Sequence, residues 1–377
     1  MSSVLILSNY FDVHAFAVAW AVEKLGHSAT TWVAPDFPSG QQNSISHSNL
    51  KGSEWKIGAK NPINSQDGFD AVWQRRIPYI LPLSKDLHEA DVELAQRESR
   101  HYFKGFLNMM CADAFWVNPV KAREKAQYKI CQTEAAIKTG LKIPATLYSN
   151  DAQEIRQFFD ENAGGIVYKS FLPIGWTQPD EKRIRLWTTK IEDRSLLNDD
   201  VELGTCPGIY QECIAKAYEL RIVIMGRTCV AAKINSQDDP NLEIDWRKST
   251  DAADVLGWDW VKIPKEIEEK CFNFMDEMGI VFGCLDFVVT PEGEYIFLEV
   301  NEQGQFLFVE QYNPEIPLLH MFSEFLISGD KHFKWHRPTS GTFSYMDYVQ
   351  TDECRYFMKE LEKEHVQYRP MILAAEN

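Results

Sequence analysis

Three oxygen-bearing side chains near residue 300 have the spacing of a metal site. Two apolar runs, Phe287 to Thr290 and Tyr295 to Val300, flank a Pro-Glu-Gly-Glu turn, and this pattern predicts a β-hairpin. Side chains two apart on a strand share a face, so Glu299 and Asn301 point the same way, and the hairpin sets Asp286 opposite Glu299. Two carboxylates and an amide suit Mg²⁺. The alternative is a solvated hairpin with ordinary surface acids, but an Asn on a strand with an apolar opposite face indicates a bound ligand.

Two lysines are placed to meet an anion. Lys169 ends the apolar strand Ile166 to Tyr168, where an ammonium at the margin of the core needs a negative partner. Lys129 lies within a predicted helix that opens at Pro119, although a lysine on a helix is most often a solvated charge. Phosphate is the natural partner, so the sequence predicts a nucleotide beside the metal cluster.

Other residues suit the remaining parts of a nucleotide and its substrate. Within the segment Gln211, Glu212, Cys213 and Ile214, backbone groups of Glu212 and Ile214 can hydrogen-bond an adenine edge while apolar side chains sandwich the ring. Arg221 lies mid-strand among β-branched neighbours, where a guanidinium either snorkels to solvent or faces a charged ligand. No Ser-His-Asp or Cys-His arrangement is evident, so no protein nucleophile is expected.

The elements that carry these residues begin with an α/β domain. A strand at Val4 to Leu7, a helix at Ala15 to Leu25 and a strand at Thr31 to Val33 predict a β-α-β start without G-x-G-x-x-G, hence an accessory domain and not a dinucleotide site. Residues 39–54 are rich in Ser, Asn and Gln and are expected to form a flexible loop.

Farther along, Trp116-Val117-Asn118-Pro119 breaks the pattern, and we expect one helix from Pro119 to about Lys138. Later strands are expected at 143–148, 165–169, 184–191, 209–214, 220–225 and 228–235, with helices at 150–162, 264–278, 314–327 and 351–366. We therefore predict an N-terminal α/β domain (1–115), a central α+β subdomain (116–210), a C-terminal α+β subdomain with the metal site (211–330) and a C-terminal extension (331–377).

Composition limits the partners and the compartment. The net charge of −16 argues against nucleic acid, and an acidic substrate would need local basic patches. Such patches occur at Arg75-Arg76, at 121–125 and at 182–185. The eight cysteines form no C-x-x-C pair, so neither disulfides nor zinc are expected. No run approaches the roughly 20 apolar residues of a membrane helix, and we expect a cytoplasmic protein without a membrane partner.

The motifs, taken in order, resemble a known superfamily. Those that carry the resemblance are Lys129, Lys169, Gln211-Glu212-x-Ile214, Glu219-Leu220-Arg221, Asp286-Phe287 and Glu299-x-Asn301. They resemble the ATP-grasp superfamily of carboxylate-amine ligases, which hold ATP between two α+β subdomains. More closely, Val72-Trp73-x-Arg75-Arg76, Trp116-Val117-Asn118-Pro119, Asp245-Trp246-Arg247 and Glu299-Val300-Asn301 with Gly304-Gln305 resemble the microviridin-type graspetide macrocyclases. The resemblance implies a pre-ATP-grasp α/β domain followed by the two ATP-grasp subdomains.

The resemblance also implies roles for individual residues. It implies phosphate contacts from Lys129 and Lys169, adenine contacts from Gln211, Glu212, Cys213 and Ile214, and a ribose contact from Glu219. It implies Mg²⁺ ligands in Asp286, Glu299 and Asn301, a phosphoryl contact from Arg221, and acceptor-carboxylate contacts from Lys233 and Arg247. A homodimer is implied in the same way. Two departures from the family pattern are Glu302, where proline is usual, and Phe306, where tryptophan is common.

The predicted function is that of an ATP-dependent carboxylate ligase. A substrate carboxylate would attack the γ-phosphate, and a hydroxyl or amine would then displace phosphate from the acyl phosphate. In a graspetide macrocyclase both groups lie on one ribosomal precursor peptide, an Asp or Glu joined to Ser, Thr or Lys. Its acidic core is expected to meet Arg75, Arg76, Lys182, Arg183 and Arg185. Two alternatives stay open: a ligase of free amino acids or short peptides, and a non-catalytic ATP-binding module.

Overall fold

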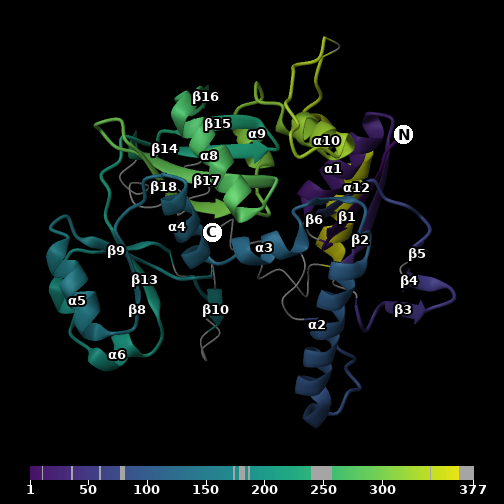
Figure 1. The fold of residues 1–377 in the computed structure, drawn as a ribbon, viewed down its shortest axis with the longest axis horizontal. Coiled ribbons are helices and arrows are strands. Elements are labelled where there is room, and N and C mark those ends of the chain that lie inside the picture. The colour runs from purple at the N-terminus through teal and green to yellow at the C-terminus, as the bar shows by residue number, and fades with distance from the viewer. Residues whose placement is uncertain are drawn as a thin grey trace.

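The computed structural model of this chain describes most of its length. The described residues are 1–10, 12–34, 37–58, 61–76, 81–172, 175–177, 183–185, 187–238, 257–339 and 341–364, with the backbone alone at 175–177, 183–185 and 360–364. The strands form a parallel N-terminal sheet, an antiparallel central sheet, an antiparallel C-terminal sheet and two small sheets (Figure 1).

The N-terminal unit is a parallel sheet in the order β2-β1-β6-β7. Its elements are β1 (Ser3–Ser8), α1 (Val13–Lys24), β2 (Ser28–Val33), β6 (Ala71–Gln74), η2 (Glu89–Asp91), α2 (Val92–Met109) and β7 (Phe115–Val117). Alternate residues of β1 serve the two faces: Val4 and Ile6 pack with α1, while Leu5 and Leu7 pack with Phe103 and Phe106 of α2. The predicted β-α-β start is confirmed.

The prediction of a flexible loop at residues 39–54 is wrong. The segment forms β3 (Gln42–Ser48) and β4 (Gly52–Gly58), and β5 (Ile63–Asn64) completes a small antiparallel sheet. Trp55 of β4 is buried against Phe106 of α2, with ring centroids 5.6 Å apart. Ser44 and Ser46 are exposed, whereas Asn43 and Ile45 are half-buried, so the polar composition masks a short alternation of exposed and half-buried residues.

A pair of short helices, α3 (Val120–Ala126) and α4 (Lys129–Lys138), leads out of the N-terminal unit. One continuous helix had been expected here. The break falls at Tyr128, whose backbone is extended and precedes the first turn of α4. The Gln132 side chain of α4 donates to the carbonyl of Ala126 at 2.7 Å and so replaces the interrupted helix hydrogen bonds.

The central sheet has the strand order β12-β9-β13-β8 and is antiparallel at every described pairing. Its elements are β8 (Thr146–Ser149), α5 (Ala152–Glu161), β9 (Ile166–Lys169), β12 (Thr189–Ile191), η3 (Arg194–Leu197), α6 (Asp200–Gly204) and β13 (Gly208–Glu212). The prediction of a single strand at 184–191 is wrong. β11 (Arg183–Arg185) pairs with β10 (Gly175–Thr177) in a separate two-stranded sheet, and β12 alone joins the central sheet.

The C-terminal sheet has the order β16-β15-β14-β17-β18. Its elements are β14 (Tyr218–Met225), β15 (Thr228–Ile234), η4 (Ser236–Asp238), β16 (Trp258–Val261), α8 (Lys265–Met278), β17 (Phe282–Val289), β18 (Tyr295–Asn301), α9 (Leu307–Tyr312) and α10 (Leu318–Ser328). One face packs under α4 and α8, and the other packs against α10 and the N-terminal unit. The predicted hairpin is confirmed, and α10 begins four residues later than expected, after Pro317.

The end of the chain returns to its beginning. Helix α12 (Asp352–Glu364) lies beside α1, although almost the whole chain separates them in sequence (Figure 1), and helix α11 (Tyr345–Val349) also contacts α1. Phe357 of α12 lies 4.3 Å from Phe16 of α1 between ring centroids, and Trp20 contacts Tyr348 of α11 at 5.7 Å. In the described ranges no helix is both long and apolar enough to cross a bilayer.

Candidate active site

Three charged residues lie directly side by side across the C-terminal sheet. Arg221 of β14 pairs with Asp286 of β17, and Asp286 pairs with Glu299 of β18. Directly opposed residues of antiparallel strands share a face, so the three side chains form one row on one face of the sheet. The predicted pairing of Asp286 with Glu299 is confirmed.

A β-bulge sets this register. Near the turn Phe287 pairs with Phe297, and one step away Asp286 pairs with Glu299, so Leu298 is an extra residue in β18. The bulge lets Phe297 and Val300, three residues apart, both stay in the core under α4 and α8. The strand can therefore keep its apolar face buried and still present Glu299 to the row.

Each carboxylate of the row is paired with a cation. Arg221 Nη1 donates to both oxygens of Asp286, at 2.7 and 2.8 Å, and Lys129 Nζ donates to Glu299 Oε2. Gln132 fixes α4, and with it Lys129, against β18. Its side chain donates to the carbonyl of Val300 at 3.0 Å and accepts from the Val300 amide at 2.9 Å. The break between α3 and α4 thus brings Lys129 to the predicted metal cluster.

Arg221 is a buried cation with unused donor capacity. Its side chain is 7% exposed, and Nη2 donates to the carbonyl of Gln305 at 3.0 Å. Within the described part of the chain, its Nε is a buried donor without a hydrogen-bond partner. Burial lowers the pKa of Arg221, but the neighbouring Asp286, Cys284 and Glu299 outweigh it and raise the pKa above its ordinary value. The guanidinium therefore stays charged and can bind an anion.

The donor set fits a divalent cation. Asp286 and Glu299 face each other across two strands, and Asn301 follows two residues after Glu299. Asn301 is exposed, and its Oδ1 accepts from the amides of Gly304 at 3.0 Å and Gln303 at 3.3 Å. Two carboxylates and an amide oxygen are hard ligands of the kind that Mg²⁺ takes together with nucleotide phosphates. Lys129 and Arg221 balance the two carboxylates, and both are cations of the kind that bind phosphate oxygens.

The segment expected at the adenine ends strand β13. The amide of Glu212 donates to the carbonyl of Ala145 at 2.9 Å and that of Cys213 to Gly165 at 3.3 Å. Gln211 is buried, and its Oε1 accepts no hydrogen bond from the described residues. Backbone hydrogen bonds thus hold the segment in place, while Ile214 makes none within the described ranges.

Glu219 and Lys169 lie on strands of different sheets. Glu219 of β14 is buried, and its Oε1 accepts from Lys216 Nζ at 2.8 Å and Ser236 Oγ at 2.9 Å. It is two residues from Arg221 and so shares its face of the C-terminal sheet. Lys169 ends β9 and pairs with Ile209 of β13, which places it in the central sheet.

Lys233 is not brought to the row. It stands opposite Leu220, which packs under α4 and α8, whereas Arg221 stands opposite Ala232, which packs toward the N-terminal unit. Lys233 therefore leaves the sheet on the other face from Arg221, and its ammonium lies 4.7 Å from the ring centroid of Tyr218.

Several candidate substrate residues fall elsewhere. Lys182 and Arg247 lie outside the described residues, and Arg183 and Arg185 are described only by the backbone of β11. The predicted surface role does not fit Arg75, which is 1% exposed and donates from Nη1 to the carbonyls of Gln303 and Gly304. Arg75 is therefore buried and bound to backbone carbonyls, and it is not part of the surface.

Arg76 differs from its neighbour. It is half-buried, and it makes no hydrogen bond or ion pair with the residues that the structure describes. It follows the C-terminal end of β6, at the sheet edge where parallel α/β sheets bind ligands.

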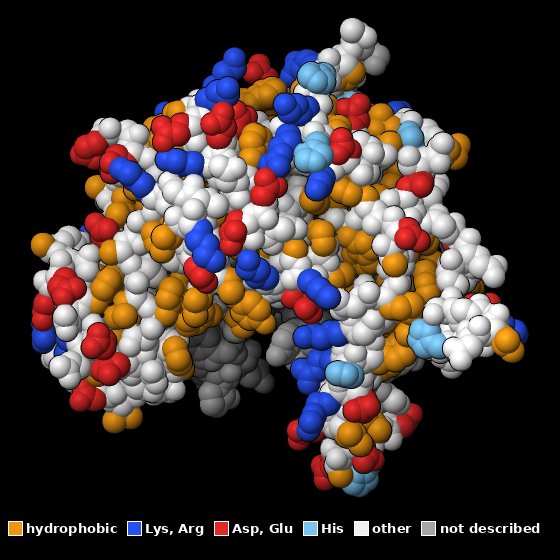
Figure 2. Space-filling model, in the orientation of Figure 1, with side chains coloured by type: hydrophobic (Ala, Val, Ile, Leu, Met, Phe, Trp, Pro, Cys, Tyr) orange, Lys and Arg blue, Asp and Glu red, His pale blue; other side chains and the backbone are white. Residues whose placement is uncertain are grey.

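Basic side chains gather in one region of this acidic protein. Figure 2 shows Lys and Arg along α2, and exposed basic residues continue from α2 (Arg97 and Lys104) to α3 (Lys121 and Lys125). This region includes the basic stretch noted at 121–125.

Sequence reasoning missed several residues that hold the site together. Gln132 lies one helical turn after Lys129, and this i, i+3 spacing was a usable signal. Asn118 was noted only as part of a motif. It is buried and binds four backbone groups, accepting from the amides of Val281 and Phe282 and donating to the carbonyls of Phe282 and Glu302. Asp12 gave no signal, because its partner Arg75 is distant in sequence.

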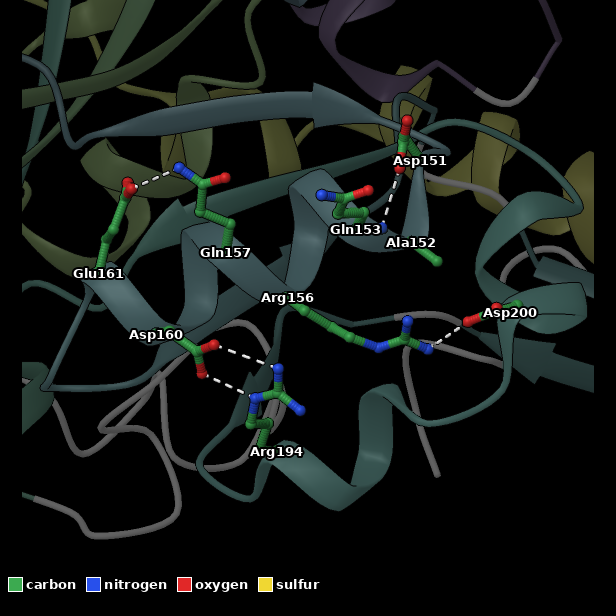
Figure 3. Close-up of a pocket in the computed structure, with 9 residues that line it drawn as sticks. All are labelled: Asp151, Ala152, Gln153, Arg156, Gln157, Asp160, Glu161, Arg194 and Asp200. Atoms are coloured by element: carbon green, nitrogen blue, oxygen red, sulfur yellow. Dashed lines mark hydrogen bonds and ion pairs between the residues drawn. The ribbon is translucent and has the colours of Figure 1, made fainter.

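A separate surface hollow of about 720 Å³ lies along α5 (Figure 3). Arg194 Nε donates to Asp160 at 2.7 Å, and Arg156 pairs with Asp200. The arginines of this hollow are thus bound to acids of the same hollow, and the carboxylate row offers the stronger candidate site.

Comparisons with known proteins show what this chain resembles. A family model described as the MvdD pre-ATP grasp domain matches residues 3–124. The macrocyclase MdnC from Microcystis aeruginosa MRC, bound with precursor peptide MdnA, is 29% identical with a TM-score of 0.75 and covers 86% of this chain and 99% of its own. The Chryseobacterium gregarium RiPP-associated ATP-grasp ligase, in complex with ADP and a leader and core peptide, is 25% identical with a TM-score of 0.79, covering 88% and 98%.

Macrocyclase MdnB from Microcystis aeruginosa MRC is 27% identical with a TM-score of 0.71 and covers 87% of this chain and 99% of its own. No curated protein matches the chain in sequence. The matches confirm the predicted fold class, including the α/β unit at the N-terminus.

Proposed function

Because the chain has the ATP-grasp fold and resembles RiPP-associated ATP-grasp macrocyclases along most of its length, we propose that it is an ATP-dependent ligase of a ribosomal precursor peptide. It would join an Asp or Glu side chain to a Ser or Thr hydroxyl or a Lys amine of the same peptide. The observation that carries the proposal is the row Arg221, Asp286 and Glu299 with Lys129 beside it. A module that only bound nucleotide would have no need for this complete set.

ATP would lie between the central and C-terminal sheets. In the proposal Lys129 and Lys169 bind phosphates, the segment 211–214 binds adenine, and Glu219 binds ribose. Asp286, Glu299 and Asn301 would hold Mg²⁺, which supplies positive charge beside the phosphates. When the metal and ATP bind, Lys129 would leave Glu299 for a phosphate oxygen.

Arg221 would act on the transferred phosphoryl group. A carboxylate of the peptide attacks the γ-phosphate and ADP leaves, giving an acyl phosphate. Arg221 is fixed by Asp286 and Gln305 and stays charged, so it can stabilise the transition state without reorganising. A hydroxyl or amine of the same peptide then attacks the acyl carbon and phosphate leaves, closing the ring.

The acceptor side is assigned to other arginines. We keep Arg247 as the candidate for the acceptor carboxylate and Arg76 as the candidate for the acidic core. Lys233 is withdrawn from the catalytic set, because it leaves the opposite face of the sheet. We further propose a cytoplasmic location, supported by eight cysteines that are all free thiols.

The test measures ADP release and peptide mass together. Purified protein is incubated with Mg²⁺ and ATP, with and without an acidic, Ser- and Thr-rich precursor peptide encoded beside its gene. We expect peptide-dependent ADP release and the loss of one water mass per ring. ADP release triggered by free amino acids, with the peptide unchanged, would favour the small-molecule ligase, and no ADP release under any condition would contradict a ligase.

A further inference from the structure

The loop after β18 is held by its own carbonyl groups. Asn301 ends β18, and residues 302–305 lead from it toward α9. In this loop the carbonyl of Glu302 accepts from Asn118, and the carbonyl of Gln305 accepts from Arg221. Arg75 binds the two carbonyls between them. Four successive carbonyls are thus each bound by a side chain from another part of the chain.

Arg75 provides the central pair of these bonds. Its Nη1 donates to the carbonyls of Gln303 and Gly304, and its side chain extends from the end of β6 in the N-terminal sheet. At 1% exposure the guanidinium is shielded from water, so these hydrogen bonds cannot be exchanged for solvent. The N-terminal unit therefore fixes a loop that follows β18, in the C-terminal sheet.

Asp12 holds Arg75 in place. Asp12 Oδ2 lies 2.9 Å from Arg75 Nε, and Oδ1 accepts from Nη2 at 3.3 Å. Asp12 is 2% exposed and also accepts from the Ser8 hydroxyl at 2.9 Å. Burial alone would raise the pKa of Asp12, but Arg75, His14 and Arg76 together with the Ser8 hydroxyl hold it below its ordinary value. The carboxylate stays ionised and orients the guanidinium from behind.

The loop in turn determines where two proposed metal ligands lie. The amides of Gln303 and Gly304 donate to Asn301 Oδ1, so the loop sets the place of that oxygen. Through the Gln305 carbonyl the loop also contacts Arg221, which binds Asp286. A shift of the loop would therefore displace Asn301 directly and Asp286 through Arg221.

We infer that Arg75, oriented by Asp12, is a positioning residue of the metal site, acting from the N-terminal unit through the backbone of residues 303 and 304. The inference rests on the proposed function, because it takes Asn301 and Asp286 as metal ligands. Loss of groups that orient metal ligands typically weakens metal binding by about 10- to 100-fold. A purely structural Arg75 would change stability without changing metal affinity.

The test uses Mn²⁺ as a paramagnetic probe on the full chain. Mn²⁺ affinity in the presence of ADP is measured by electron paramagnetic resonance of the free ion, and ADP affinity without metal is measured by calorimetry. For Arg75→Lys we expect a Mn²⁺ Kd raised about tenfold with an unchanged metal-free ADP Kd. An ammonium keeps the positive charge, but its single nitrogen cannot occupy both the Nε position beside Asp12 and the Nη1 position beside the two carbonyls.

The matched control is Arg227→Lys. Arg227 also binds a carboxylate, donating to Asp276 at 2.7 and 2.9 Å, but its side-chain hydrogen bonds go to α8. We expect this variant to keep the wild-type Mn²⁺ Kd. If Arg75→Lys does not fold, Asp12→Asn is tested in its place. Asparagine keeps the shape of the side chain and one accepting oxygen, and we expect this variant to raise the Mn²⁺ Kd severalfold.

The outcomes separate cleanly. A folded Arg75→Lys with wild-type Mn²⁺ affinity would overturn the inference, and so would equal losses of Mn²⁺ and metal-free ADP binding. Failure of the wild-type protein to bind Mn²⁺ and ADP at all would contradict the proposed function, and the inference with it.

Discussion

At the residue scale the site is a balance of two carboxylates and two cations. Asp286 is paired with a buried arginine, whereas Glu299 is paired with a lysine, and both partners of that second pair are about one-quarter exposed. Breaking a buried pair leaves an uncompensated charge and costs far more than breaking a partly exposed one. Glu299 can therefore be changed with little effect on folding, so a loss of activity in such a variant can be attributed to the site and not to unfolding.

We predict that Glu299→Gln abolishes turnover while leaving the fold intact. The substitution removes one of the two carboxylates proposed for Mg²⁺. Loss of a residue that only orients a metal ligand lowers activity roughly 10- to 100-fold, so loss of a ligand itself should lower peptide-dependent ADP release by more than that. The free energy of unfolding should change by less than about 1 kcal/mol. ADP release and urea denaturation are measured on the same preparation. Wild-type ADP release at ordinary Mg²⁺ would contradict the assignment of Glu299.

At the element scale the 302–305 loop depends on a glycine. Gly304 has a φ of +53°, and a Cβ there would lie 2.6 Å from Phe282 Cζ and 3.0 Å from Cys284 Sγ. The loop can pass over the buried end of β17 only because this residue lacks a side chain. Gly304 belongs to the sequence motif that follows Asn301, and the structure shows why a glycine is needed there.

We predict that Gly304→Ala destabilises the protein by about 3 kcal/mol. Roughly 1 kcal/mol comes from the left-handed backbone and roughly 2 kcal/mol from overpacking against Phe282. Gly293→Ala is the control, because Gly293 has a φ of +84° but nothing within 4 Å of its Cβ position. The control should cost only the backbone part. Equal urea midpoints for the two variants would show that the close contact with Phe282 is unimportant.

A second element-scale feature is a buried acid where three helices meet. Glu310 of α9 is 0% exposed, and it accepts from the amide of Leu319 in α10 at 2.9 Å and of Tyr345 in α11 at 3.1 Å. Burial raises its pKa to about 8, although these two amides lower it. The folded state therefore binds a proton that the unfolded state has already lost above its ordinary pKa of 4.5.

Stability should consequently fall as pH rises from about 4.5 to about 8, because in that window folding takes up a proton, and proton uptake becomes less favourable as pH rises. Glu310→Gln removes the titration, so its free energy of unfolding should depend less steeply on pH over the same range. Urea unfolding at several pH values measures both slopes. Parallel slopes for wild type and variant would mean that Glu310 is already ionised in the folded protein.

The elements that sequence patterns predicted well are those whose signals are local. The β-α-β start and the 282–301 hairpin have regular apolar periodicity, and the Asp286 to Glu299 pairing followed from the turn. The break at Tyr128 was missed because the Gln132 side chain that compensates for it binds β18, far along the chain. Arg75 was misplaced on the surface because both its partners, Asp12 and the 303–304 carbonyls, are distant in sequence.

At the scale of the whole molecule, the two ends of the chain share one core. Tyr348 of α11 is 0% exposed and packs with Trp20 of α1, and Phe357 of α12 packs with Phe16. The extension after residue 330 is thus part of the fold, although its composition gave no sign of what it would cover. It closes the outer side of α1, whose inner side packs on the N-terminal sheet.

We predict that Tyr348→Ala lowers the free energy of unfolding by about 3–5 kcal/mol, the usual cost of deleting a fully buried large aromatic side chain. Tyr356→Ala is the control on α12. Its side chain is 66% exposed, so its removal should cost less than about 0.5 kcal/mol. Chemical denaturation of both variants measures the difference. Similar small costs would mean that the extension does not contribute to the common core.

The bulge at Leu298 separates the hairpin turn from the row of Arg221, Asp286 and Glu299. The extra residue lies between the turn and Glu299, and beyond it the pairing of Asp286 with Glu299 is fixed by the neighbouring buried pair Leu285 and Val300. The turn itself is exposed from Pro291 to Glu294. It offers an engineer an insertion point, where a fluorophore or an affinity tag could report on the hairpin without changing the register of the ligands.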